Sequence, residues 1–175
     1  MARPADAESR DELPEYCTAG VLVLGCGNPL MGDDGFGPAV AERLLAGPAR
    51  AGICVINAGT GSRGIIFNMV TGTQRPKAIM IVDALRAGKR PGELFWVDIE
   101  DLSLEKAEDF SLHMTPASNM LLELKKMGVE IRVLACEPKD LPEVMTEGLS
   151  DEVAAAVGPA ARMVLRAADE ILKSA

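Results

Sequence analysis

Three ionisable side chains in this sequence are placed where they could bind a cation. Asp34 follows a glycine-rich turn in the stretch VLVLGCGNPLMGDDGFGPAV (21–40), Asp83 ends the apolar run IMIVD, and His113 is the only histidine. Two carboxylates and one neutral imidazole suit a divalent ion such as Mn, Fe, Co, Ni or Zn, and they leave coordination positions open. We therefore take Asp34, Asp83 and His113 as a candidate metal site.

Each of these residues also has a plainer interpretation. Asp33 and Asp34 precede a predicted helix, where aspartate is a common cap. Asp83 could cap the following turn, although burying a carboxylate after five apolar residues costs several kcal/mol unless a cation or strong donors compensate. A single histidine such as His113 is more often a surface or core residue than a ligand. The spacing of the three matches no standard metal motif, so both interpretations stay open.

The elements that must position these residues form an α/β pattern. Strands are predicted at 20–26, 52–57, 77–84 and 130–136 with a peripheral strand at 92–98, and helices at 35–46, 65–71, 113–128 and 150–173. Gly158-Pro159 is expected to kink or divide the last helix. The alternation predicts a mainly parallel sheet of about five strands with helices on both faces. Ligands in such folds bind beyond the carboxyl ends of the strands, where all three candidates are expected.

Composition narrows the classes of function. The net charge of −8 argues against nucleic acid or an anionic membrane as a partner. A flexible N-terminal tail is expected over residues 1–18, followed by a single domain over 19–175. The four cysteines lie far apart and form no CxxC pair, which disfavours a zinc or disulfide framework and favours a cytoplasmic location. No apolar run suits a signal peptide or a membrane span.

The chain also carries an ordered set of motifs. GCGNPLMGDDGFG (25–37) resembles the G-x-G-N-x-L-x-x-D-D-G-x-G signature of [NiFe]-hydrogenase maturation endopeptidases, and INAGT (56–60), IVDAL (81–85) and SLHMTP (111–116) follow in the expected order. The branch that serves the coenzyme F420-reducing hydrogenase is the most similar. The resemblance implies a helix–sheet–helix fold around a twisted, mostly parallel sheet.

The resemblance further implies a metal-dependent endopeptidase that removes a C-terminal extension from the hydrogenase large-subunit precursor after nickel insertion. The metal-contacting positions of the family map onto Asp34, Asp83 and His113. The nickel would be supplied by the precursor, and another divalent metal could occupy the isolated protein. Many relatives carry an acid where this chain has Asn57, and an amide cannot act as a base. The catalytic group is therefore unassigned.

The loop around Asn57 has two interpretations. We expect Asn57, Gly59 and Thr60 to bind the substrate tail through exposed backbone groups, although an ordinary tight turn between strand and helix explains the same glycines. A phosphoacceptor receiver domain is the alternative for the whole chain. It would bind Mg²⁺ through Asp33-Asp34 and Asp83, with Lys139 after the fifth strand.

Overall fold

The computed structural model describes residues 14–100 and 115–174. The strands are β1 (Val21–Cys26), β2 (Ile53–Gly59), β3 (Ala78–Ala84), β4 (Leu94–Val97) and β5 (Glu130–Cys136). The helices are α1 (Glu15–Thr18), α2 (Phe36–Leu45), α3 (Ser62–Thr71), α4 (Thr115–Lys126) and α5 (Asp151–Lys173), and a 3-10 turn, η1, spans Gly32–Gly35. The strand order is β2-β1-β3-β5-β4. All neighbours pair in parallel except β4, which is antiparallel to β5.

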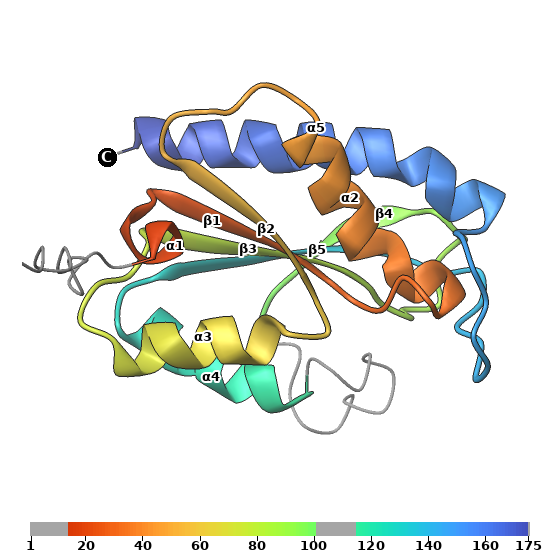
Figure 1. Ribbon diagram of the computed structural model, residues 1–175, viewed down its shortest axis with the longest axis horizontal. Coiled ribbons are helices and arrows are strands. Elements are labelled where there is room, and N and C mark those ends of the chain that lie inside the picture. Colours follow the sequence, from red (N-terminus) through yellow and green to blue (C-terminus); the bar gives the residue numbers. More distant parts are fainter. Residues whose placement is uncertain (1–13, 101–114, 175) are drawn as a thin grey trace, which may run out of the picture.

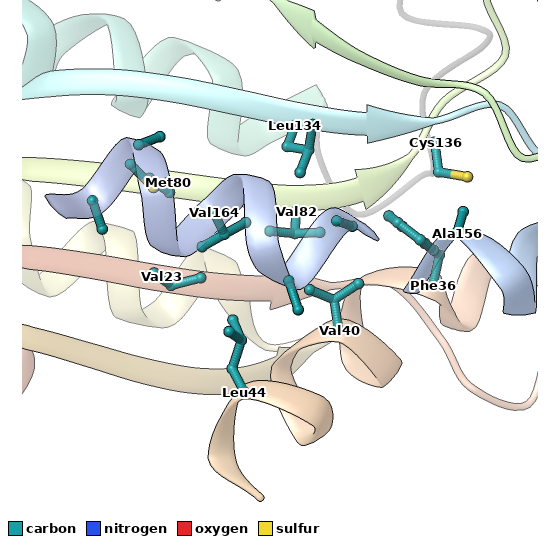
Figure 2. Packing of buried hydrophobic residues seen from close by; sticks show 14 of the residues in the cluster. Val23, Phe36, Val40, Leu44, Met80, Val82, Leu134, Cys136, Ala156 and Val164 are labelled. Carbon is teal, nitrogen blue, oxygen red and sulfur yellow. The ribbon is translucent and has the colours of Figure 1, made fainter. Parts of the chain in front are cut away.

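Helices cover both faces of this sheet, which confirms the predicted helix–sheet–helix layers. Helices α2 and α5 lie on one face, and α3 and α4 lie on the other (Figure 1). Because side chains alternate along a strand, Val23 of β1 joins the α2/α5 core while Leu24 joins the α3/α4 core. Strands β1 and β3 are buried on both faces, which explains why they are apolar apart from Asp83 near the end of β3. Figure 2 shows Val40 of α2 and Val164 of α5 near Val82 of β3.

Helix α2 approaches the sheet more closely than a side chain would allow. A Cβ atom at Gly37 would clash with the carbonyl oxygens of Cys26 and Val82. Cys26 is the last residue of β1, and Val82 lies two residues before the end of β3. The first turn of α2 therefore lies directly on the ends of the two central strands. This contact places η1, which immediately precedes α2 and carries Asp34, over the carboxyl edge of the sheet.

Two predictions about the elements are wrong. Helix α5 continues through Gly158 and Pro159, so the last helix is not divided. Burial of its apolar face, from Val153 to Ile171, outweighs the hydrogen bond that Pro159 cannot donate. The flexible tail predicted over residues 1–18 also extends too far along the chain, because residues 15–18 form α1. Cys17 of α1 is buried in the α3/α4 core.

No helix in the two described ranges has the length and apolarity that crossing a bilayer requires.

Candidate functional site

The site lies where the order of the strands reverses. From β1 the chain passes to β2 on one side and later to β3 on the other side of β1, so β1 and β3 form the switch point of the sheet. In open parallel sheets, the loops that leave such a point diverge and form a crevice beyond the carboxyl ends. Asp34 follows β1, and Asp83 is the next-to-last residue of β3. Both therefore belong to this crevice.

Gly27 brings these two aspartates together. Its φ of +120° is a conformation that residues with a side chain rarely adopt. A Cβ atom at this position would clash with the carbonyl oxygen of Asp34 and would lie 3.4 Å from Oδ1 of Asp83. Hence the loop after β1 packs directly on the backbone of η1, and the Asp83 carboxylate lies close to the same position.

The side chain of Asp34 braces this loop from within. The backbone N–H of Asn28 donates to Oδ2 of Asp34 at 2.7 Å, and the N–H of Leu30 donates to Oδ1 of Asn28 at 3.0 Å. Asp34 is 7% exposed. This charge-assisted hydrogen bond from a backbone N–H orients the Asp34 carboxylate.

Asp83 is almost completely buried, with 1% of its surface exposed. Its Oδ1 accepts the N–H of Ala84 at 2.9 Å. Along β3 it alternates with Val82 and shares the face of Ile79 and Ile81, which belong to the α3/α4 core. The carboxylate therefore emerges from the sheet on the side that α3 and α4 cover.

The buried Cys26 thiol lies near both carboxylates. Burial is the main cause that raises the pKa of Cys26, and the negative charges of Asp83 and then Asp34 raise it further. Both acids are thus close enough to act on one buried group. Because the thiolate is the reactive form, Cys26 stays a protonated core thiol and is no candidate nucleophile.

The third predicted ligand, His113, lies outside the described residues. Helix α4 begins at Thr115, two residues later, at the carboxyl edge of the sheet (Figure 1). Within the described ranges alone, no three His, Cys, Asp or Glu side chains gather closely enough to hold a metal ion. Asp34 and Asp83 supply two oxygen donors of the kind that divalent cations accept. The three-residue metal site stays a prediction.

Asp33 accepts backbone N–H groups, as its capping interpretation expects, but they belong to a distant segment and not to the helix that follows. It is 2% exposed. Its carboxylate accepts the N–H groups of Lys139, Asp140 and Ser150 at 2.8, 3.2 and 2.7 Å, and the Ser150 hydroxyl at 3.0 Å. These donors lie more than a hundred residues away along the chain, so no local pattern could predict them. Asp33 fastens the segment between β5 and α5 to the site loop.

The same contacts disfavour the receiver interpretation. Such a domain needs a free acidic pair after the first strand, but Asp33 is saturated by four hydrogen bonds. It also needs a lysine aimed at the acids, whereas Nζ of Lys139 pairs with Glu152 at 2.8 Å. The Asp33 carboxylate instead holds the segment between β5 and α5, and the Lys139 ammonium forms an ion pair with α5.

The predicted substrate loop divides into two parts. The carbonyl of Gly59 accepts the N–H of Gly27 at 3.1 Å, which places Gly59 and the exposed Thr60 beside the site loop. The amide of Asn57 instead donates to Oε1 of Glu42 on α2 at 3.2 Å. Gly59 and Thr60 therefore adjoin the acids, while Asn57 turns toward α2. Substrate binding by all three stays a prediction.

Comparison with known proteins decides the family. The model of the hydrogenase maturation protease family matches residues 38–167, which are most of the chain. The chain belongs to this family. The resemblance inferred from its motifs is confirmed, and a peptidase is the class of enzyme that this family comprises.

Individual members of the hydrogenase maturation protease family agree over nearly the whole chain. A candidate hydrogenase maturation protease of Methanocaldococcus jannaschii is 35% identical over 147 residues, covering 83% of this chain and 94% of that protein. The coenzyme F420 hydrogenase subunit delta of Methanothermobacter thermautotrophicus is 32% identical over 158 residues, covering 87% and 95%. The structure of the hydrogenase maturating endopeptidase HybD from E. coli superposes with a TM-score of 0.70 at 25% identity, covering 86% and 92%. The α/β fold of the protease family is thereby confirmed.

Proposed function

We propose that this protease removes a C-terminal extension from the large-subunit precursor of a [NiFe]-hydrogenase after nickel has been inserted. In this proposal the protease recognises the inserted nickel through Asp34, Asp83 and His113. The observation that carries it is that two buried aspartates, Asp34 and Asp83, both approach Gly27 at the switch point of the sheet, Asp34 through its backbone carbonyl and Asp83 through its carboxylate. Membership of the maturation protease family supplies the class of reaction.

The chemistry of these three ligands supports recognition of nickel in the precursor without its removal from the precursor. Two carboxylates and one imidazole bind nickel less tightly than a site rich in thiolates does, and they leave coordination positions open. Nickel held by cysteines of the precursor could fill these positions and remain bound to the precursor. The ion would then align the scissile bond, polarise its carbonyl or activate a water molecule.

One named relative supports a partner, and the free cysteines support a compartment. Because one relative is the delta subunit of coenzyme F420 hydrogenase, we propose the large subunit of such a hydrogenase as the precursor. All four cysteines are free, which is usual for proteins of the reducing cytoplasm, and we place the reaction there. The net charge of −8 supports a protein partner over nucleic acid.

The test uses nickel-loaded precursor and mass spectrometry of the cleaved product. We expect the wild type to release the extension and Asp34→Asn, Asp83→Asn and His113→Gln each to slow release more than about a hundredfold, because each removes one ligand of the shared ion. Asp169→Asn is the matched control, since Asp169 lies on α5 and pairs with Arg50. Full cleavage by any of the three variants would remove that residue from the site. A wild type that leaves the precursor intact would overturn the proposal.

A further inference from the structure

Three of the large hydrophobic side chains exposed in the described residues belong to two segments that pair through their backbones beside the site. Leu30, Val144 and Met145, which we call the apolar lip, are 45%, 71% and 72% exposed. The N–H of Thr146 donates to the carbonyl of Leu30 at 2.9 Å, and the N–H of Gly32 donates to the carbonyl of Thr146 at 2.7 Å. Met31 and Thr146 form the parallel bridge between the two segments. Leu30 and Met145 each precede a bridged residue, so their side chains emerge on the same side.

The apolar lip is held in place at both ends. Asp33 accepts hydrogen bonds from the backbone of Lys139 and Asp140 before the lip and from Ser150 after it. Pro142 lies against Gly32, where a Cβ atom would be 3.2 Å from the proline ring. An apolar surface that the fold fixes in water is characteristic of an interaction site.

The lip is also continuous with the candidate site. Leu30 lies in the loop whose Asn28 donates to Asp34, so the lip begins in the same loop that carries this carboxylate. Glu143 and Glu147 border Val144 and Met145, and both are exposed. The partner that fits this surface is a protein with an apolar centre and lysine or arginine side chains around it.

We propose that the apolar lip is the docking surface for the hydrogenase large-subunit precursor, which it holds while the extension reaches the acids. This inference rests on the proposed function. A second copy of this chain fits less well, because self-association would bring Glu143 and Glu147 against acids of the same kind in a protein of net charge −8. The lip supplies affinity for the precursor, and Asp34 and Asp83 act on its nickel.

The experiment separates docking from cleavage. We would measure the Kd for nickel-free precursor, and the KM and kcat for nickel-loaded precursor, with wild type and with Val144→Ser/Met145→Ser. We expect the double variant to weaken both Kd and KM by about tenfold or more and to leave kcat unchanged, because hydrophobic anchors contribute most at the centre of an interface. Met127→Ser is the matched control: Met127 is 48% exposed and follows α4 at the amino edge of the sheet.

A charge variant tests the same surface without removing apolar groups. Glu143→Lys/Glu147→Lys should slow association with the precursor about tenfold at low salt, and added salt should reduce the difference. Unchanged Kd and KM in the serine variant would overturn the docking surface. A wild type that binds precursor but does not cut it would overturn the proposed function alone. Dimeric wild type that becomes monomeric in the serine variant, with unchanged precursor affinity, would assign the lip to a second copy of the chain.

Discussion

The absence of a side chain at Gly27 is what allows the two acids of the site to come together. The backbone carbonyl of Asp34 lies where a Cβ atom would be, and Oδ1 of Asp83 lies 3.4 Å from that same position. The sequence placed Asp34 and Asp83 at one edge because parallel strands end together. It could not specify the close approach at Gly27, since that contact involves residues 56 positions apart in the chain.

Gly27→Ala is predicted to destabilise the protein by at least about 2 kcal/mol, since it combines a positive φ with a clash against backbone. Urea unfolding measures the change. Gly64→Ala is the control, because Gly64 lies in α3 with no atom within 4 Å of the added Cβ, and alanine there should stabilise by about 0.5–1 kcal/mol. Equal effects at the two glycines would refute this explanation of the loop.

Cys26 and Cys136 are predicted to take no part in the reaction. Burial, with smaller contributions from the charges of Asp33 and Glu137, raises the pKa of the Cys136 thiol to about 12. At pH 8 only about one Cys136 in ten thousand is then a thiolate, and the fraction rises only as the pH approaches 12. Iodoacetamide should therefore modify Cys26 and Cys136 only after unfolding, as judged by peptide mass spectrometry. Rapid labelling of the folded protein at pH 8 would contradict the burial of these two thiols.

At the scale of elements, the sequence predicted best where burial is uniform. Strands β1 and β3 were recognised because both faces are covered and nearly all of their residues are apolar, with Asp83 as the exception in β3. The continuity of α5 was missed because Pro159 is a local signal, whereas the stabilising burial comes from contacts with the sheet. The role of Asp33 was missed for the same reason, since its donors are brought to it only by the completed fold.

Asp33→Ala should cost about 3 kcal/mol of the free energy of unfolding, because it leaves three backbone N–H groups of the β5–α5 segment without their acceptor. It should also weaken precursor binding, since the same segment carries the apolar lip. Asp33→Asn should be intermediate, because one oxygen remains. Asp140→Ala is the control: its side chain is 78% exposed and a change within about 0.5 kcal/mol is expected. A similar loss from both alanine variants would remove the special role of Asp33.

At the scale of the whole molecule, the function follows from one edge of the sheet. The switch point beside β1 collects Asp34, Asp83, Gly59 and the apolar lip, although they come from distant parts of the chain. The sequence predicted the layers, the edge and the family, because alternation of elements and an ordered motif set carry that information. The third predicted metal ligand, His113, lies outside the described residues, so its part in the site stays a prediction.

The most direct test compares the same precursor with and without nickel. Purified wild-type protease is mixed with each form, and intact-mass spectrometry follows release of the C-terminal extension. If two carboxylates and an imidazole recognise the ion itself, as we propose, nickel-loaded precursor is cut while nickel-free precursor stays whole. Cleavage of both forms at the same rate would contradict it.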